Sequence, residues 1–543
     1  MLKRKYLVFK LTLIVLLVGN VALSQLKAPS ASFRIFPSTT TQTEPVVCFS
    51  PLNKQIMFAS SYTINTSSAF RSEGVYVSTN GGYNWFGTDT CKGVNLQNHG
   101  GDPGISIDKN GVFIITHIGS IITGVYSHFS TDMGSTWSNA YTLTSLQPED
   151  KGSSTTDDSP ASPFYGRTYA SWVNFVSPFP VLVSYTTNSG ANWTSPSAIN
   201  SSPPQRCSGG YIKTGLNGNV YVSWSGVSST SPFTENYAGF AMSSNGGVNW
   251  TVYQNAYAMN GINGTLLTKG NIRVNGLPRF DIDKSGGPRN GWIYMITAEK
   301  NLSPAGSDPD IIMHRSTNNG LNWSAGIRVN QDALNNGKIQ YCPSVDVDST
   351  GALNVIYYDD RNTSADSAEV MLSRSKDGGN TWTDITISDH RFKPKPITGG
   401  AASYQGDFIS LVSNGNKLYA HWMDDFSGIY QIWSTIIDLN TIGITKISSE
   451  IPSGFKLEQN YPNPFNPETR IKYSVPKNSN ITVKLYDIQG RELRTLSEGY
   501  HSAGTYEINF NANEFGKTLP SGVYFYKLIS DDFTASRKML LTK

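Results

Sequence analysis

Most of the chain consists of short segments in which apolar residues alternate with polar ones, separated by clusters of Gly, Asn, Asp, Ser and Pro. This period of two is typical of half-buried strands, and helical runs rich in Leu, Ala, Glu and Lys are nearly absent. We therefore predict an all-β protein. Pairs of strands joined by a turn begin near seven positions: Glu44, Asp102, Lys151, Cys207, Leu277, Cys342 and Gly406.

One octapeptide with the pattern [ST]-x-[DN]-x-G-x-[NT]-W follows the first six of these strand pairs. The copies are STNGGYNW (78–85), STDMGSTW (130–137), TTNSGANW (186–193), SSNGGVNW (243–250), STNNGLNW (316–323) and SKDGGNTW (375–382). Successive tryptophans are 52, 56, 57, 73 and 59 residues apart. A spacing of this size fits one four-stranded propeller blade with its loops.

The residue types of the octapeptide predict a turn between two strands. The Asp or Asn side chain accepts backbone N–H bonds, Gly supplies a positive φ, and Trp packs against the neighbouring sheet. We expect these residues to be structural and to take no part in catalysis. They are Asn80, Trp85, Asp132, Trp137, Asn188, Trp193, Asn245, Trp250, Asn318, Trp323, Asp377 and Trp382.

The octapeptide resembles the Asp box, or BNR repeat, of sialidases and related β-propellers. The resemblance implies a propeller over residues 25–439. Seven strand pairs predict seven blades, whereas sialidases usually have six, so a six-bladed ring with one irregular unit stays open. The ring is expected to close through the segment Ser32–Pro37, which would hide two strand edges, or through Thr441–Ser448.

Alternating Ile, Val and Tyr residues broken by Pro, Asn and Gly continue after a linker at 440–453 and predict a small Ig-like β-sandwich over 454–543. The segments YPNPF (461–465), LYDIQGR (485–491), SGVYFY (521–526) and KMLLTK (538–543) closely resemble the type A sorting domain of the bacterial type IX secretion system. The resemblance implies that residues 454–543 contact the type IX machinery at the outer membrane.

The first 24 residues carry Lys3, Arg4 and Lys5, then an apolar run and small residues near Ser24, which predicts a cleaved signal peptide. A membrane anchor is the alternative, but no later segment is long and apolar enough to span a bilayer. Lys and Arg total 43 against 40 Asp and Glu, which excludes the basic surface of a nucleic-acid binder. We expect a protein that is secreted or held at the outer cell surface after passing through the periplasm.

Candidate chemistry should lie at the mouth of the propeller, where first strands begin and second strands end, because the octapeptides fall at the opposite end. Sialidases resemble this arrangement in outline, with three arginines that hold a carboxylate, a Tyr–Glu nucleophile pair and an Asp acid/base. By that resemblance the ligand-binding candidates are Arg206, Arg279 and Arg361. Tyr404 with Glu299 would imitate the nucleophile pair, and Asp102 and Asp359 complete the catalytic candidates. The Arg-Ile-Pro motif of sialidases is absent, since the matching strand begins Thr43-Glu44-Pro45.

Two pairs of acids, Asp281 with Asp283 and Asp346 with Asp348, faintly resemble calcium loops but lack further ligands, so we interpret them as hairpin turns. No Cys/His spacing suggests a zinc site, and no cofactor or metal is expected. The sequence thus predicts a sialidase-like propeller that binds glycans. The more specific hypothesis is that it also hydrolyses them. The competing hypothesis is a non-catalytic surface adhesin or protein-binding scaffold.

Overall fold

The computed structural model describes residues 26–27, 31–65, 67–68, 70–91, 99–200, 203–439, 444–448, 450–512 and 519–542. This part of the chain is almost entirely β, which confirms the predicted fold class, and its helical turns are the short 3-10 segments η2 (Leu216–Gly218) and η3 (Leu267–Lys269). Among the described residues no helix has the length and apolar character needed to cross a membrane. The expected signal peptide, residues 1–24, lies outside them.

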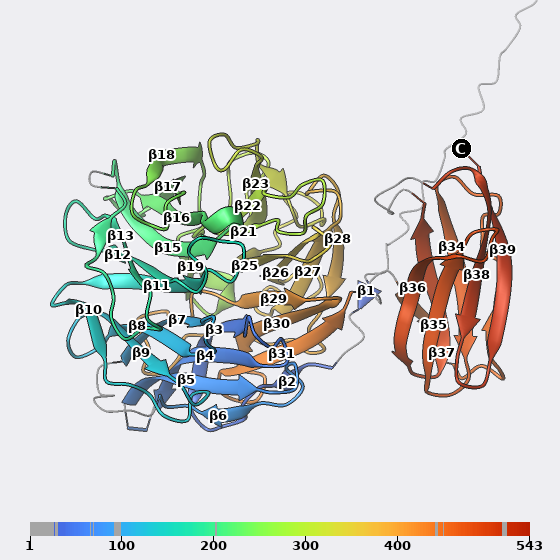
Figure 1. Cartoon of the computed structure of the whole chain (residues 1–543), viewed down its shortest axis with the longest axis horizontal. Helices are drawn as coiled ribbons and strands as arrows, with labels where there is room; N and C mark the ends of the chain where they lie inside the picture. Colours follow the sequence, from blue (N-terminus) through green and yellow to red (C-terminus); the bar gives the residue numbers. More distant parts are fainter. Residues whose placement is uncertain are drawn as a thin grey trace, which may run out of the picture.

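Seven sheets arranged as a propeller form the larger part of the chain (Figure 1); each has four antiparallel strands, and the sixth has a fifth strand added in parallel. The first sheet has β3 (Thr41–Phe49), β4 (Met57–Asn65), β5 (Phe70–Ser78) and β6 (Phe86–Thr88), in that order. The second has β7 (His99–Ile107), β8 (Phe113–Gly119), β9 (Gly124–Ser130) and β10 (Tyr141–Ser145). The third has β11 (Glu149–Thr156), β12 (Thr168–Asn174), β13 (Val181–Thr186) and β14 (Ser197–Ala198).

The next three sheets repeat this order. The fourth has β15 (Arg206–Thr214), β16 (Val220–Val227), β17 (Glu235–Ser243) and β18 (Thr251–Ala258). The fifth has β21 (Arg279–Ile282), β22 (Ile293–Glu299), β23 (Asp310–Ser316) and β24 (Ile327–Arg328). The sixth has β25 (Gln340–Val347), β26 (Leu353–Asp359), β27 (Glu369–Ser375) and β28 (Thr383–Thr386), with β1 (Leu26–Lys27) parallel to β28.

The seventh sheet combines the two ends of this part of the chain. It consists of β29 (Ser410–Asn414), β30 (Lys417–Asp424), β31 (Gln431–Asp438) and, as its outer strand, β2 (Phe33–Arg34). Arg34 pairs with Trp433, and the Ile35 N–H donates to the carbonyl of Ile432 at 3.1 Å. The segment expected to close the ring, Ser32–Pro37, thus supplies the outer strand of this sheet. The alternative is wrong, because β32 (Ile444–Ser448) pairs with a strand of the C-terminal sandwich.

The first strands of consecutive sheets contact one another in the order β3, β7, β11, β15, β21, β25 and β29, and β29 contacts β3. Apolar side chains fill the space between sheets. Phe58 of β4 stacks on Phe113 of β8 with ring centroids 4.8 Å apart, and both belong to a buried cluster with Trp137. This packing places the first strands around a shared channel.

The six octapeptides all lie between the third and fourth strands of their sheets and share one set of hydrogen bonds. In the first copy the Gly82 N–H donates to the Ser78 hydroxyl at 2.8 Å, and the Asn84 N–H donates to Oδ1 of Asn80 at 2.9 Å. The same two bonds recur in the other five copies. Gly82 has a φ of +85°. The predicted turn chemistry is confirmed.

The tryptophans of these turns are less buried than the sequence predicts. Trp137 and Trp193 are buried, but Trp85, Trp250, Trp323 and Trp382 are only half-buried. A turn at the edge of a sheet covers one face of the indole and leaves the other face near solvent. The fully buried tryptophans instead lie on second strands: Trp172, Trp224 and Trp422.

An insertion explains the long spacing of 73 residues between two of the tryptophans. Between β18 and β21 the chain forms a hairpin of β19 (Gly264–Leu266) and β20 (Ile272–Val274) with η3 between them. Nζ of Lys269 in η3 lies 2.5 Å from Oδ2 of Asp360 and also donates to two backbone carbonyls, at 365 and 367. The hairpin is thereby anchored to the loop that follows β26 in the sixth sheet.

The C-terminal part forms two further four-stranded sheets packed on a common apolar core. One contains β32, β33 (Lys456–Leu457), β34 (Glu468–Val475) and β37 (Gly504–Asn511). The other contains β35 (Ser479–Tyr486), β36 (Glu492–His501), β38 (Gly522–Ile529) and β39 (Thr534–Leu541). β32 falls inside the segment expected to be a linker, 440–453, because its backbone completes a sheet with β37.

Two of the sequence segments that resemble a sorting domain support this sandwich. The Phe465 N–H donates to the carbonyl of Leu540, and the Thr542 N–H donates to that of Phe465, both at 3.0 Å. Asp487 accepts the backbone N–H of Arg491 at 3.0 Å across a turn in which Gly490 has a φ of +75°. The first segment thus joins the terminal strand to the fold, and the second makes a tight hairpin turn.

Candidate functional site

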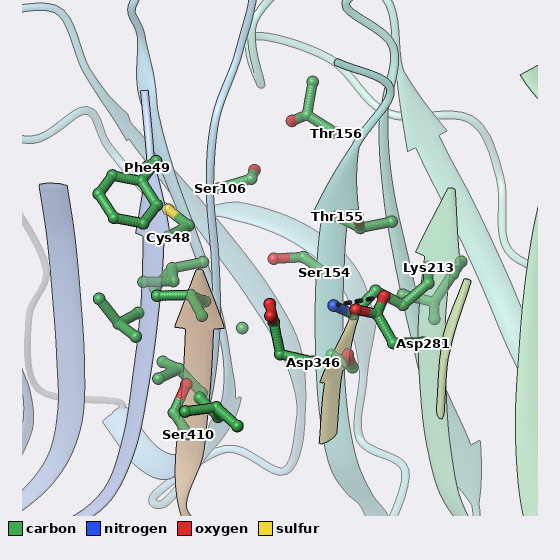
Figure 2. Close-up of a pocket in the computed structure, with 18 of the residues that line it drawn as sticks. Cys48, Phe49, Ser106, Ser154, Thr155, Thr156, Lys213, Asp281, Asp346 and Ser410 are labelled. Atoms are coloured by element: carbon green, nitrogen blue, oxygen red, sulfur yellow. Dashed lines mark ion pairs between the residues drawn. The ribbon is translucent and has the colours of Figure 1, made fainter. Parts of the chain in front are cut away.

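The first strands enclose a cavity of about 300 Å³ in the channel of the propeller. Figure 2 shows Lys213, Asp281 and Asp346 pointing toward one another across it. Nζ of Lys213 lies 3.3 Å from Oδ1 of Asp281. Burial alone would lower the pKa of Lys213, but Asp281, Tyr211 and Asp346 together outweigh burial, and the pKa is raised. Burial and the neighbouring Asp281 raise the pKa of Asp346.

The paired acids identified in the sequence therefore have two different roles. Asp283 and Asp348 do serve turns, because each accepts the backbone N–H of the residue two positions later at 2.9 Å. Asp281 and Asp346 lie earlier, on first strands, and face the channel (Figure 2). Sequence reasoning missed them because it assigned each pair to one turn. Strand alternation could have indicated this difference. Side chains two residues apart point to the same face only while the strand continues, and each strand ends before the second acid of its pair.

The mouth of the channel contains a second group of polar residues, which we call the mouth cluster: Glu44, Glu73, Asp102, Arg273, Tyr404 and Asp407. Two of them, Glu44 and Asp102, occupy β-bulges of first strands in the left-handed region, with φ of 56° and 52°. A non-glycine residue in this region is strained and is commonly found at functional sites. The bulge breaks strand pairing where the channel opens.

Tyr404 lies at the centre of the mouth cluster. Its hydroxyl hydrogen-bonds to the Glu44 carboxylate, and Oε1 of Glu44 also accepts the Asp407 N–H at 3.1 Å. Burial and the nearby Glu44, Asp407 and Asp102 raise the pKa of Tyr404 well above its usual value. The phenol is therefore protonated at neutral pH, and a carboxylate in contact with it is placed to accept its proton.

Arg273 brings the positive charge of the mouth cluster and comes from β20 of the insertion. Its Nη2 lies 2.8 Å from Oδ2 of Asp407, and its guanidinium stacks over the Tyr404 ring at 4.8 Å. The Arg273 side chain is 42% exposed. Sequence reasoning missed this residue because it lies outside the repeats, although the spacing of 73 residues marked the insertion.

Glu73 is a buried acid of the mouth cluster that the sequence also failed to indicate. Its Oε1 accepts the Gly101 N–H at 3.1 Å, and no partner is found for its Oε2 among the described residues. Burial, Glu44 and Asp102 raise its pKa well above the usual value. The neutral form of Glu73 is thus favoured where it lies buried beside two other acids.

The three predicted arginines have separate surroundings. Arg206 lies between the rings of Phe175 and Phe233, at 5.4 and 5.7 Å. Arg279 lines the channel and stacks on Tyr211 and Phe408, at 4.6 and 4.8 Å. The rings that flank Arg206 are therefore different from those that flank Arg279. The sequence placed both at one mouth, but flanking aromatic rings hold each in its own position.

Arg361 belongs to an acid network in the sixth sheet. It forms ion pairs with Asp359 at 2.7 Å and with Asp384 of β28. Asp359 is fully buried, and burial raises its pKa to about 6 although Arg361 opposes this. This arginine ties an inner strand to an outer strand, so its acids leave no open side for a ligand carboxylate.

The sequence suggested that Glu299 pairs with Tyr404, but the structure gives Glu299 other partners. Its Oε2 accepts the Asn260 N–H at 3.2 Å, its Oε1 accepts the Thr297 hydroxyl at 2.5 Å, and Gly261 bridges to its backbone. The segment leading into the insertion therefore covers Glu299. The acid that contacts Tyr404 is Glu44, which the sequence placed at the mouth but left without a role.

Residues 459–542 match the family model described as a secretion system C-terminal sorting domain. The tail is therefore a type IX sorting domain, and the chain is exported to the cell surface or beyond it. Through this domain it interacts with the secretion machinery. Among curated proteins no sequence match was found.

Several solved structures are similar to this chain at low identity. One is a protein of unknown function from Dyadobacter fermentans, 11% identical, covering 77% of this chain and 100% of its own, with a TM-score of 0.45. Another is a polysaccharide lyase of family PL25, an ulvan lyase, at 11% identity, 76% and 96% coverage, and a TM-score of 0.44. A leech intramolecular trans-sialidase is 13% identical, with 75% and 70% coverage and a TM-score of 0.35. At this level of likeness, function has to be argued from the side chains of this chain.

Proposed function

We propose that the chain is an exported glycan-binding protein, in which a seven-bladed Asp-box propeller presents the mouth cluster to a carbohydrate and residues 454–543 direct export. Each four-stranded sheet would be one blade, and residues 25–439 the propeller. The six shared turns and the contact between β29 and β3 support this interpretation.

The observation that carries the proposal is the convergence of Tyr404, Glu44, Asp407 and Arg273 at the mouth. Carboxylates accept hydrogen bonds from sugar hydroxyls, and a guanidinium donates several in a fixed geometry. A cluster that combines acceptors, donors and an aromatic ring has the composition of a ligand site. The channel cavity begins one residue further on, at Pro103 and Phe408. Arg273 adds a partly exposed cation that an acidic sugar can contact.

Hydrolysis is the second candidate function, and the contact between Tyr404 and Glu44 favours it. The pairing is similar to the Tyr–Glu nucleophile of sialidases, which is an exception to the usual carboxylate pair of glycosidases. In this version Glu44 takes the phenol proton as Tyr404 attacks the anomeric carbon, and Asp102 donates a proton to the leaving oxygen. The charge on Arg273 then orients the substrate.

The full exported chain would test both functions on an immobilised glycan array and on a panel of chromogenic glycosides. We expect retention on specific glycans, lost by at least tenfold in Tyr404→Phe and Glu44→Gln. The matched control is Tyr221→Phe, because Tyr221 donates to Asn319 in an octapeptide turn at the other end of the propeller. Turnover lost in the same two variants would support hydrolysis.

Two results would contradict the proposal. Retention of no glycan would leave the protein-binding scaffold as the better hypothesis. Retention equally strong in Tyr404→Phe, Glu44→Gln and Tyr221→Phe would place the binding surface away from the mouth cluster. Circular dichroism of each variant would show that the fold is intact before binding is compared.

A further inference from the structure

Three histidines that have no role in the proposed function lie together inside the second sheet. His99 is on β7, His117 on β8 and His128 on β9, and each is about 1% exposed. One ring nitrogen from each lies within 4.8 Å of the others. The imidazole rings are nearly parallel, and the centroids of His99 and His117 are 3.8 Å apart. Three imidazoles buried side by side need a physical reason, because each carries polar nitrogens.

Backbone carbonyls fix the orientation of two of these rings. Nδ1 of His117 lies 2.8 Å from the carbonyl of Ile118, and Nδ1 of His128 lies 3.0 Å from that of Ser138. A carbonyl only accepts, so Nδ1 carries the proton and Nε2 presents a lone pair. Donation of the other ring N–H to a backbone carbonyl is the usual outer-shell arrangement of a metal-binding histidine.

Three of the four remaining ring nitrogens are buried without a partner among the described residues. Neither nitrogen of His99 has a hydrogen-bond partner among the described residues, and neither does Nε2 of His117. A buried polar atom left unpaired costs about 1 to 3 kcal/mol.

His314 shows which part of this arrangement belongs to the repeat. It occupies the corresponding position in the fifth sheet, and its Nδ1 lies 2.9 Å from the carbonyl of Ser324 as that of His128 does from Ser138. There the ring stacks on Tyr257, at 3.7 Å between centroids. The position therefore accepts a histidine for structural reasons. Only the second sheet adds two more histidines to it.

We propose that His99, His117 and His128 form a binding site for a divalent transition metal, with zinc as the expected ion. Neutral imidazole suits zinc, copper, iron and nickel, and three histidines with one open position is an established zinc arrangement. The fourth ligand would be a water or a small anion, and an anion, or hydroxide formed from the water, would offset part of the charge that three neutral ligands leave. None of the three histidines belongs to the mouth cluster, and a bound metal would hold three strands of one sheet together.

Binding requires a modest rearrangement of the side chains. Zinc–nitrogen bonds of about 2.0 to 2.1 Å place tetrahedral ligand atoms about 3.4 Å apart, closer than the 4.8 Å spread of the three nitrogens. Parallel rings must also rotate out of their stack so that their lone pairs meet. His99 is the ring free to do so, since no hydrogen bond to its nitrogens would be broken.

The full chain, purified without a histidine tag or chelator, would be analysed for metals by mass spectrometry. We expect about one zinc per chain, removal by a chelator, and a melting temperature that rises again when zinc is restored. Cobalt added to the stripped protein should give the visible absorption of a tetrahedral site. His117→Gln and His99→Asn should each lose metal and cobalt absorption at least tenfold, whereas His314→Gln should keep both.

A variant could also lose metal because it no longer folds, so the fold of each variant has to be checked. Circular dichroism and tryptophan fluorescence of metal-free His117→Gln should match those of the metal-free parent, because a folded apo site is already present. Absence of bound zinc and of any zinc-dependent shift in melting temperature would overturn the proposal. So would equal loss of metal in His314→Gln, which would indicate binding elsewhere.

Discussion

Tyr404 illustrates how a single residue receives its properties from distant parts of the chain. Glu44 from the first sheet accepts its hydroxyl, and Arg273 from the insertion covers its ring. Neither neighbour is close to Tyr404 in sequence. Its raised pKa is therefore a product of the ring of sheets, since burial and acids from separate sheets combine at one point.

The turn tryptophans give a prediction at the same scale. Trp137 is 6% exposed and lies 5.9 Å from the Phe58 ring, so Trp137→Ala should lower the free energy of unfolding by about 3 to 5 kcal/mol. Trp250 is only half-buried, and Trp250→Ala should cost about 1 to 2 kcal/mol because it returns less apolar area to water.

Urea unfolding followed by tryptophan fluorescence would measure both values. All 11 tryptophans precede Leu439, so the signal reports on the propeller alone. Equal losses in the two variants would mean that burial of the indole does not determine its contribution.

Among the elements, the inserted hairpin has the most influence on the candidate site, because it supplies Arg273 and rests on one buried lysine. The ammonium of Lys269 is fully buried and meets three acceptors, which matches its three N–H donors. Burial lowers its pKa although Asp360 opposes this. The three hydrogen bonds of the Lys269 ammonium thus hold the hairpin against the sixth sheet.

Lys269→Met should lower the free energy of unfolding by about 3 to 5 kcal/mol, because Asp360 would stay buried without its cation. Lys393→Met is the control, since Lys393 and its partner Asp366 are 72% and 51% exposed, and water screens an exposed pair, so its loss should change stability far less. Urea unfolding of both variants would compare them. A Lys269→Met protein as stable as the parent would contradict the anchoring role.

The strands and turns could be predicted from the sequence because their signals are local. Alternation located the strand pairs, and the octapeptide fixed the turns at Gly82 and Asn80. The candidate site could be predicted only in outline. Glu44 was placed at the mouth by its position in the repeat, but its contact with Tyr404 depends on how the first and seventh sheets meet. Arg273 depends on where an insertion folds, and no periodic pattern encodes that.

At the scale of the whole molecule, a propeller and a sandwich follow each other along the chain, each with its own apolar core. Because β32 pairs with β37, the sandwich begins before Gly454, and a cut that separates the two parts belongs after Leu439. The contacts that complete the seventh sheet all lie before that residue.

A chain truncated after Leu439 should fold but fail to leave the cell envelope. We expect a far-ultraviolet circular dichroism spectrum of β type and a cooperative melting transition, with the protein recovered from the periplasmic fraction and absent from the medium and outer surface. Fractionation and immunoblotting against the full chain would check this. Normal amounts of truncated protein outside the cell would contradict the role of the tail in sorting.

The pairing of β2 with β31 also sets an order of events in time. Arg34 and Trp433 meet although 399 positions separate them, so the last sheet has no outer strand until almost all of the propeller has been made and delivered. Closure over so long a loop is slow, and an interrupted chain keeps an open edge at both ends. The sorting tail follows directly after this point. A chain that has its sorting domain therefore also has every strand of the propeller. A chain interrupted earlier lacks the last strands of the propeller and the sorting domain as well.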